Sequence, residues 1–429
     1  DVRIHPRDKM KMYVTDNFAG LVRSDDAGAT WRASNQGISV RAGATNDVIP
    51  IFSVTLDPNN PDIVWAGTNG GGTIFGIFKS TDGGGSWNLK ANGVTSPPEG
   101  IAIRGFTVQP GNSNIVYAMT EDRTAIQGLE FNRVRGTVYK TTNGGESWSV
   151  IWQGNNLARY LIIDPNDVRT LYVSTGIFDR EADDSDCAAG RYGGVGILKS
   201  TDGGSTWAAI NDGLTNLYVG ALRMHPTNSQ VLFAAVGNNS CSGGYVGDQK
   251  GGLFRTTDGG VSWRTVISKT LMTTVNFAPS NPDVVYAGSA SAFYRSSDGG
   301  LTWSRLILAG SSQGELPWGP VGVRPGVPID VVIDPVDPNL VYANNYGGGV
   351  FRSTDGARTW EIWSKGYSGA NVRAVHIPAA NPSGVLVIGQ SGPYRSVNYG
   401  GDWMGIATGP AASAFSWSTI ASDPRDARI

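Results

Sequence analysis

Short runs of β-branched and aromatic residues alternate with clusters of Asp, Asn, Pro and Gly along the chain. In one stretch, the run at 329–333 is followed by an Asp-Pro turn and then by a second run at 340–344. A third run at 350–353 and a fourth that opens at Trp360 complete the stretch. Asp, Asn and Pro clusters between such runs are turns between strands. The pattern therefore predicts units of four antiparallel strands.

A second pattern marks the start of each fourth strand. It reads Ser/Thr-x-Asp/Asn-x-Gly-x-Ser/Thr-Trp in most copies and recurs at spacings of 40 to 61 residues. The copies end at eight tryptophans: Trp31, Trp87, Trp148, Trp207, Trp263, Trp303, Trp360 and Trp403. One motif at this period indicates an array of like units, and four-stranded units in an array are the blades of a β-propeller. We predict an all-β propeller over residues 1–429, with eight complete units and the start of a ninth.

The two ends leave the closure of the array open. The chain begins within a first-strand pattern at 1–4 and reaches another at 416–420. Both ends are therefore truncated within repeats, which allows the chain to be part of a larger one. One large ring, or one ring that runs into a second domain, would accommodate these units.

The Asp or Asn of each repeated turn has a structural role in this prediction. Its side chain accepts hydrogen bonds from the turn between the third and fourth strands, while the glycines supply positive φ and the Trp packs against the neighbouring blade. The residues assigned this role are Asp26, Asp82, Asn143, Asp202, Asp258, Asp298, Asp355 and Asn398.

These turns resemble the Asp-box, or BNR, repeat along the whole chain. That repeat occurs in sialidases, in xyloglucanase-type glycoside hydrolases, in sortilin-type receptors and in photosystem II assembly-factor propellers. The resemblance implies a propeller fold and leaves the function open among these classes.

Composition narrows the partners. The chain has 34 basic and 36 acidic residues, only 16% of its residues are charged, and it has no basic run. Nothing therefore suggests a nucleic-acid partner or an anionic membrane surface. No apolar run reaches the 18 residues that a membrane span requires.

Strand alternation divides the loops between two faces. The turns within the repeated motifs lie on one face, and the connections that vary in length lie on the other: 32–50, 90–103, 120–136, 175–195, 236–251 and 306–328. Binding residues tend to sit on variable loops of a rigid scaffold, so this variable face is the candidate functional face. Cys187 and Cys241 fall in such loops of consecutive units. We predict a disulfide between them, which implies an oxidising compartment; two unpaired thiols are the alternative.

Several catalytic classes are disfavoured. The three histidines, His5, His225 and His376, lie at or just before a repeat turn next to proline, which argues against a catalytic triad or a zinc site. The glycine-rich stretches follow the repeat, not a nucleotide-binding fingerprint. Residues 3–6 read Arg-Ile-His-Pro, which departs from the Arg-Ile-Pro start of sialidases.

Carboxylate chemistry remains open, and it would mean glycoside hydrolysis. Residues 12–16 read Met-Tyr-Val-Thr-Asp and place Asp16 on the variable face. Xyloglucanase-type enzymes carry a catalytic Asp in a similar context in their first blade, so the resemblance implies that Asp16 is one of two carboxylates. The sequence departs from those enzymes after Asp16. The late repeat position that would correspond to their second catalytic carboxylate is near Gln390, which cannot act as an acid or base. Asp47, Glu99 and Glu315 are other candidate carboxylates, and a turn-capping role is the alternative for Asp16.

Other variable-loop residues suggest binding. Aromatic rings stack on sugars, and the candidates for this are Phe18, Phe131, Tyr192, Tyr245, Trp318 and Tyr346. Trp318, in a proline-flanked loop, is the strongest candidate for an exposed contact residue, with packing over the central channel as its alternative. The acidic loop at 179–186 offers Asp183, Asp184 and Asp186 as ligands for a structural Ca²⁺, with a solvated acidic loop as the alternative.

The preferred hypothesis is an extracellular, cell-surface or periplasmic propeller that binds protein or glycan through its variable face without catalysis. The alternatives are a glycoside hydrolase acting on xyloglucan or a related β-glucan, and a structural subunit of an extracellular assembly. No cofactor other than Ca²⁺ is expected.

Overall fold

The computed structural model describes residues 2–71, 74–127, 131–186, 188–238, 250–289, 292–306, 318–319, 327–345, 350–363, 372–376, 385–389, 392–398, 402 and 404–405. Every regular element in this part of the chain is a β-strand. The all-β class is therefore confirmed. No helix in the described part is long and apolar enough to cross a membrane.

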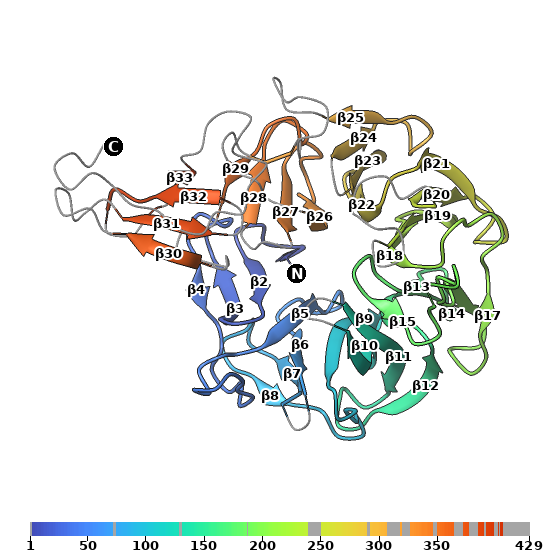
Figure 1. The fold of residues 1–429 in the computed structure, drawn as a ribbon, viewed down its shortest axis with the longest axis horizontal. Helices are drawn as coiled ribbons and strands as arrows, with labels where there is room; N and C mark the ends of the chain where they lie inside the picture. The colour runs from blue at the N-terminus through green and yellow to red at the C-terminus, as the bar shows by residue number, and fades with distance from the viewer. Residues whose placement is uncertain are drawn as a thin grey trace.

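Five four-stranded antiparallel sheets and one nine-stranded sheet surround a central axis (Figure 1). The first sheet contains β1 (Val2–Ile4), β2 (Met12–Asp16), β3 (Gly20–Ser24) and β4 (Arg32–Ala33). The nine-stranded sheet contains β5 (Ile51–Leu56), β6 (Val64–Gly70), β7 (Ile77–Ser80), β8 (Asn88–Leu89), β9 (Ile101–Gln109), β10 (Asn112–Gln127), β11 (Phe131–Thr141), β12 (Ser149–Gly154) and β15 (Glu181–Ala182).

The other sheets follow in chain order. Two contain β13 (Ala158–Asp164), β14 (Asp167–Thr175), β16 (Ile197–Ser200) and β17 (Ala208–Ala209), then β18 (Val219–His225), β19 (Asn228–Val236), β20 (Gly252–Thr256) and β21 (Arg264–Ser268). Two more contain β22 (Met272–Ala278), β23 (Asn281–Ser289), β24 (Phe293–Ser296) and β25 (Ser304–Leu306), then β26 (Pro328–Ile333), β27 (Val341–Asn345), β28 (Val350–Ser353) and β29 (Glu361–Ile362). A further sheet contains β30 (Val372–His376), β31 (Leu386–Gly389), β32 (Gly392–Arg395) and β33 (Met404–Gly405).

The ring closes before the last sheet. The inner strands β1, β5, β9, β13, β18, β22 and β26 contact one another in this order, and β26 contacts β1. Sheet β30–β33 lies outside this ring (Figure 1). Of the two arrangements that the sequence left open, the structure therefore shows a closed ring with one sheet beyond it.

The predicted count of eight complete units and the start of a ninth is corrected by these sheets. The second and third predicted units share one sheet, because β6 pairs with β9 through Asn69–Ala102 and Gly70–Ile101. The long hairpin of β10 and β11 extends that sheet further. The start of the ninth unit was predicted within 416–429, which lies outside the described residues.

The repeated Asp and Asn residues organise their turns as predicted. Asp82 Oδ1 accepts hydrogen bonds from the Ser86 amide at 2.9 Å and the Ser80 hydroxyl at 2.7 Å, and Oδ2 accepts one from the Ser86 hydroxyl at 2.7 Å. The amide of Gly84 in turn donates to the Ser80 hydroxyl at 2.8 Å. Equivalent contacts are made by Asp26, Asn143, Asp202, Asp258, Asp298, Asp355 and Asn398.

The repeated tryptophans join neighbouring blades. Trp148 Nε1 donates to the Lys90 carbonyl of the preceding unit at 2.8 Å, and its backbone amide donates to the Asn92 carbonyl at 2.9 Å. Gly93 follows Asn92 at φ 89°, and a Cβ there would lie 2.2 Å from the Trp148 carbonyl. A Cβ at Gly37 or Gly213 would likewise clash with the backbone carbonyl of the repeated Trp in the next unit. At Trp87, Trp148 and Trp263 the preceding blade therefore accepts hydrogen bonds from both the indole and the backbone of the following one.

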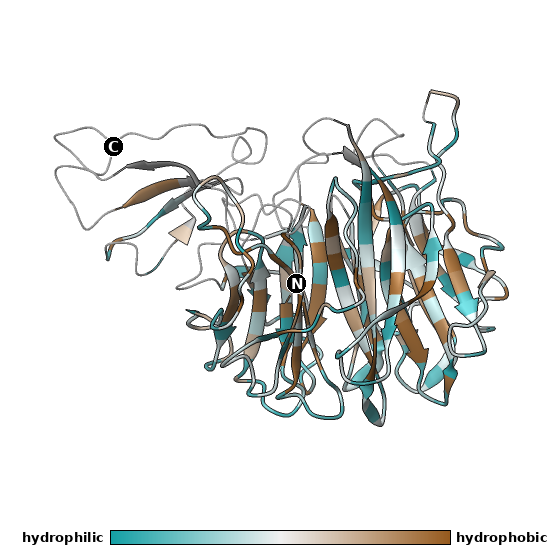
Figure 2. Ribbon diagram, turned by 90° about the horizontal axis from the view of Figure 1, so that it is seen from below, coloured by the Kyte–Doolittle hydropathy of each residue, from teal (hydrophilic) through white to brown (hydrophobic). Residues whose placement is uncertain are grey.

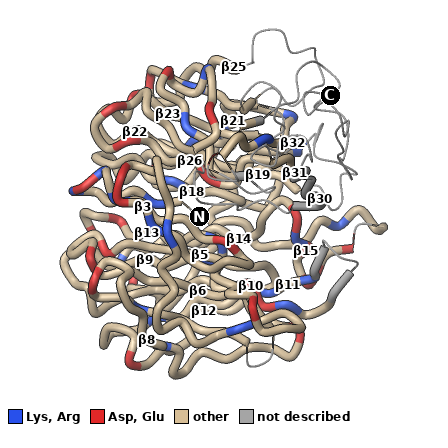
Figure 3. The backbone as a smooth tube through the Cα atoms, turned by 90° about the vertical axis from the view of Figure 1, so that its left-hand side faces the viewer, with Lys and Arg blue, Asp and Glu red and all other residues tan. Residues whose placement is uncertain are grey.

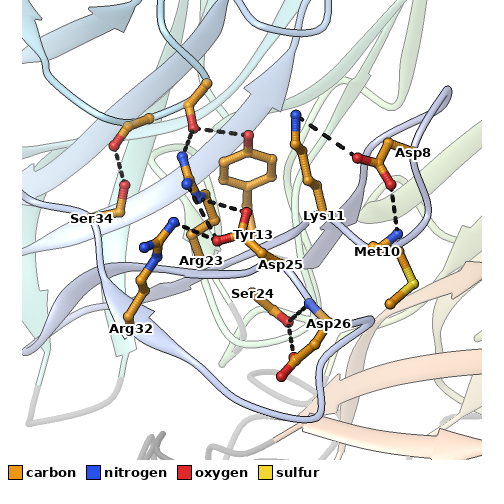
Figure 4. Close-up of polar contacts among 12 residues, drawn as sticks. Asp8, Met10, Lys11, Tyr13, Arg23, Ser24, Asp25, Asp26, Arg32 and Ser34 are labelled. Carbon is orange, nitrogen blue, oxygen red and sulfur yellow. Dashed lines mark hydrogen bonds and ion pairs between the residues drawn. The ribbon is translucent and has the colours of Figure 1, made fainter.

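Polar side chains of the second and third strands add a second contact between blades. Tyr13 and Arg23 both donate to the Gly83 carbonyl of the next unit, at 3.0 and 2.7 Å (Figure 4). In the next unit Lys79 lies over the Trp65 ring and donates to the Gly144 carbonyl at 3.1 Å.

The core lies between adjacent sheets. Large side chains of the second strands are fully buried there, among them Tyr13, Trp65, Tyr117, Tyr172, Phe233 and Tyr286. The strands carry both apolar and polar bands, because buried and exposed positions both occur along them (Figure 2). Basic and acidic residues are interspersed along the visible backbone, in keeping with the balanced composition (Figure 3).

Candidate functional site

Asp16 is the last residue of β2 and caps the turn into β3. Its Oδ1 accepts hydrogen bonds from the backbone amides of Phe18 and Ala19, both at 2.7 Å. Gly20 closes the turn at φ 88° and pairs with Asp16 across the hairpin. The turn-capping alternative is therefore present, and it also fixes the direction of the carboxylate.

Phe18 gives the same turn an exposed aromatic ring. Its side chain is 58% exposed, whereas large apolar side chains in the blades are mostly buried. The loop that follows the first sheet packs against this turn, because the Ile49 amide donates to the Phe18 carbonyl at 2.9 Å and Ile49 forms a parallel bridge with Ala19. The two kinds of variable connection therefore meet on one face, as the strand alternation predicted.

Asp47 lies on that second loop, two residues before Ile49. Its Oδ1 accepts a hydrogen bond from the Thr45 hydroxyl at 2.5 Å, and this bond is the main reason that its pKa is lowered. Glu99 is exposed, in a turn of another variable loop. Glu315 lies outside the described residues. Asp47 is the candidate carboxylate whose loop contacts the turn of Asp16.

Trp318 corrects one prediction. It is 3% exposed and packs edge-on against Phe293, Trp360 and Phe351, with ring centroids 5.0, 5.4 and 5.5 Å away. These rings belong to β24 and to the unit of β26–β29, so Trp318 fills the core between two blades. The buried ring lacks the exposed face that the contact hypothesis required.

The other predicted binding residues lie on other segments of the chain or outside the described residues. Phe131 begins β11, at the far end of the β10–β11 hairpin. Tyr192 is half-buried and lies under Lys250, whose Nζ is 3.9 Å from the ring centroid. Tyr245, Tyr346, Cys187 and Cys241 lie outside the described residues, so the disulfide stays a prediction.

The three carboxylates proposed for Ca²⁺ make separate contacts. Asp183 accepts from the Thr124 hydroxyl at 2.7 Å and pairs with Arg135 at 2.9 Å. Asp184 accepts from a backbone amide, and Asp186 pairs with Arg191 at 3.0 Å. The described residues hold no group of three acidic, His or Cys side chains suited to a metal ion. The Ca²⁺ site stays a prediction without support from these contacts.

A buried charge network on β9 and β10 was missed by the sequence analysis. Glu121 is 1% exposed, and its carboxylate lies 3.0 Å from Arg104, 3.2 Å from Arg180 and 3.6 Å from Arg123. Burial opposes ionisation of Glu121, but the three guanidinium groups outweigh burial and lower its pKa to about 2. The arginines are spread over three segments, so no sequence motif announces the network.

Asp122, next in the chain, has the opposite shift. Burial raises its pKa, although the hydroxyls of Thr137 and Thr120 donate to its two oxygens at 2.5 and 2.7 Å. Among the described carboxylates only Asp122 has a raised pKa. Both donors lie on the same sheet, which indicates that Asp122 fixes the register of the hairpin.

The sheets define a β-propeller, and the turn of Asp16 and Phe18 is the candidate site on it. No family model matches the chain. A xyloglucanase of Acetivibrio thermocellus, Xgh74A, is 26% identical over 268 residues, covering 54% of this chain and 29% of that protein. A xyloglucanase of Hypocrea jecorina is 29% identical over 230 residues, covering 48% of this chain and 25% of that protein. The chain thus spans less than a third of either relative.

A solved structure supports the fold. The crystal structure of a GH74 xyloglucanase from Xanthomonas campestris superposes with a TM-score of 0.63 at 15% identity, covering 95% of this chain and 67% of that chain. This likeness establishes a β-propeller fold related to that of the xyloglucanase.

Proposed function

We propose that this chain is the propeller part of a xyloglucanase-type protein, which binds a β-glucan such as xyloglucan across its variable face. The observation that carries the proposal is the β2–β3 turn, where Asp16 and the exposed Phe18 lie two residues apart. An aromatic face stacks on a sugar ring, and a fixed carboxylate accepts bonds from sugar hydroxyls. The matched relatives, which are named as xyloglucanases, support this ligand class.

Within this proposal Asp16 is one of the two carboxylates of glycoside hydrolysis. The amides of Phe18 and Ala19 hold its carboxylate in one direction, which suits a reacting group. A second carboxylate about 5 to 9.5 Å away would complete the pair. Asp47 suits a base or nucleophile better than a proton donor, because the Thr45 hydroxyl lowers its pKa.

A non-catalytic binding module is the second candidate. It is favoured by the same two hydrogen bonds, since they give Asp16 a sufficient structural reason to be present. Either function would place the protein outside the cytoplasm, where the proposed polysaccharide occurs and where the predicted Cys187–Cys241 disulfide would persist.

The test combines hydrolysis and binding. Reducing-sugar release and affinity electrophoresis would be measured on xyloglucan, mixed-linkage β-glucan and cellulose with the wild type, Asp16→Asn and Phe18→Ala. The control is Asp8→Asn, because Asp8 also accepts a bond from a turn amide, that of Met10 at 3.2 Å, but in a turn between first and second strands.

Release that is lost in Asp16→Asn and kept in Asp8→Asn would support hydrolysis. Binding without release, weakened in Phe18→Ala, would support the non-catalytic module. Neither binding nor release on any of the three polymers would contradict the proposed function.

A further inference from the structure

Six inner strands carry a β-bulge at the same place. In each, the pairing with the second strand skips one residue near the start of the inner strand. A bulge re-aims the side chain of the extra residue and is typical of barrel rims and functional sites. The extra residues are, in order around the ring, Phe52, Arg104, Arg159, Gly220, Thr273 and Ile329.

Two neighbouring members of this set are buried arginines with different partners. Arg104 is 5% exposed, lies 4.6 Å from the Phe52 ring and pairs with Glu121. Arg159 is 3% exposed, and its Nη2 donates to the Tyr160 hydroxyl at 3.0 Å. No Asp or Glu of the described residues forms an ion pair with Arg159, and its buried Nε has no hydrogen-bond partner there. Arg159 is thus a buried cation without a counter-charge in this part of the chain.

The surroundings of Arg159 are also positive. Arg223 also lies over the Tyr160 ring, 4.2 Å from its centroid, and shares the carboxylate of Asp330 with Arg3. Among the described residues nearby, five arginines share three carboxylates, Arg3, Arg104, Arg123, Arg180 and Arg223 with Glu121, Asp179 and Asp330, and Arg159 pairs with none of the three.

The pKa values of two neighbouring groups reflect the positive charge around Arg159. Burial, and then the charge of Arg159, lower the pKa of Arg104 to about 10, against the opposing effect of Glu121. Burial raises the pKa of the Tyr160 phenol, but Arg159 and the other nearby arginines outweigh it and lower that pKa. Both shifts are expected where positive charge is in excess.

The segment that leads into Arg159 belongs to a buried apolar cluster. Leu157, two residues before Arg159, is buried with Ile177 and Phe178 from the connection after β14 and with Leu271 from the segment before β22. Arg159 itself is 3% exposed. Burial strengthens the interaction of a cation with an anion, so an anion beside Arg159 would be held more strongly than at the surface.

We propose that the ring axis binds a small tetrahedral oxyanion of the phosphate or sulfate class, with Arg159 as its principal ligand. The planar guanidinium donates two parallel hydrogen bonds to such an anion, and Arg104 adds charge from the adjacent bulge. A buried cation without a counter-charge is destabilising, and the bound anion would provide the counter-charge that Arg159 lacks among the described residues. This site is separate from the Asp16 turn and does not depend on the glycan proposal.

The test is isothermal titration calorimetry of the full chain with inorganic phosphate at pH 7 in low salt. The wild type should bind one phosphate saturably, with sulfate competing. Arg159→Gln should weaken binding at least tenfold, and Arg159→Lys should fall between, because it keeps the charge and loses the planar fork. The matched control is Arg264→Gln, an exposed arginine on β21, which should bind as the wild type does.

Thermal unfolding gives a second readout for the same variants. Phosphate should raise the midpoint of the wild type and of Arg264→Gln above its value in chloride of equal ionic strength, and leave that of Arg159→Gln unchanged. No saturable phosphate binding by the wild type, or equal binding by Arg159→Gln, would overturn the site. Saturable binding of acetate without phosphate would overturn the tetrahedral class.

Discussion

Arg3 and Asp330 are 327 positions apart in the sequence, and their side chains form an ion pair of 2.7 Å where the ring closes. Asp330 is fully buried, and Arg223 approaches its other oxygen at 3.6 Å. On the outer side of the same seam, the Trp31 indole donates to the Trp363 carbonyl at 3.3 Å. The first and last sheets of the ring are thus joined by the same kind of indole contact that Trp87, Trp148, Trp207 and Trp263 make with the preceding blade.

Replacing Asp330 with Asn should open this seam more easily. The change leaves Arg3 and Arg223, which are 25% and 18% exposed, without their carboxylate. Because solvent screens both guanidinium groups, the loss should be smaller than the roughly 3 to 5 kcal/mol that removal of one partner from a fully buried pair costs. Urea unfolding at pH 7 would measure the loss. Asp283→Asn, at an exposed position near the start of β23, is the control and should change the midpoint little. A midpoint for Asp330→Asn equal to that of the control would show that the seam does not depend on the ion pair.

The sequence predicted the blade and its turns but not the limits of the ring. The strand runs and the Trp motif follow local rules, and the Asp82 turn has the contacts that its residue types require. Ring closure depends on which two blades pack against each other. The local sequences around Arg3 and Asp330 do not indicate that these two residues form an ion pair. The junction of β6 with β9 likewise arises from two residue pairs at strand ends.

Glu121→Gln should destabilise the ring in a pH-dependent way. Its folded pKa, about 2, is below the ordinary value of 4.5, so the carboxylate contributes stability that is fully present above pH 4.5 and lost as the pH falls through about 2. At pH 7 the variant should lose about 3 to 5 kcal/mol, because three arginines lose one shared counter-charge. The difference from the wild type should shrink steadily between pH 4.5 and pH 2 in urea titrations.

The control for this series is Glu146→Gln. Glu146 pairs with Lys90 at 2.5 Å, but its side chain is 65% exposed, so solvent screens the pair. Its removal should change stability little at any pH. A pH-independent loss in Glu121→Gln would mean that packing, and not charge, gives Glu121 its role.

Gly93→Ala should be among the more damaging single-methyl changes. Gly93 has φ 89°, which costs an alanine about 1 to 2 kcal/mol, and the new Cβ would lie 2.2 Å from the Trp148 carbonyl. Gly111→Ala separates the two effects, because Gly111 has φ 77° and a Cβ there meets nothing within 4 Å. Thermal unfolding should place the Gly93 variant well below the Gly111 variant. Equal midpoints would show that the backbone shifts to relieve the clash.

The candidate site was predicted only where it is local. Asp16 and Phe18 belong to one short turn, so their proximity follows from the sequence. Trp318 was misjudged because its proline-flanked loop gives no sign of the three rings that enclose it. Nothing in the sequence marked Arg159 as a site residue. A bulge can be recognised only from the residue that is skipped in the pairing of two strands. An arginine without a counter-charge can be recognised only when its neighbours in space are known.

The stabilities of Asp82→Asn and Asp82→Ala should show how much the hydrogen bonds of the repeated turn contribute. The alanine removes both acceptors and should cost about 1 to 2 kcal/mol, as loss of a capping side chain does. The asparagine should cost less, because Asn143 already serves in the same turn, accepting from the Ser147 amide and donating to its hydroxyl, both at 3.0 Å. The bond from Ser80 and those from Ser86 lower the pKa of Asp82 to about 2, so the advantage of Asp over Asn should be complete above pH 4 and vanish as the pH falls through about 2. Urea unfolding of the two variants, with Asn143→Asp as the reciprocal control, would measure these differences. If Asp82→Asn is as unstable as Asp82→Ala at pH 7, the turn depends on the charge of Asp82 and not on its hydrogen-bond geometry.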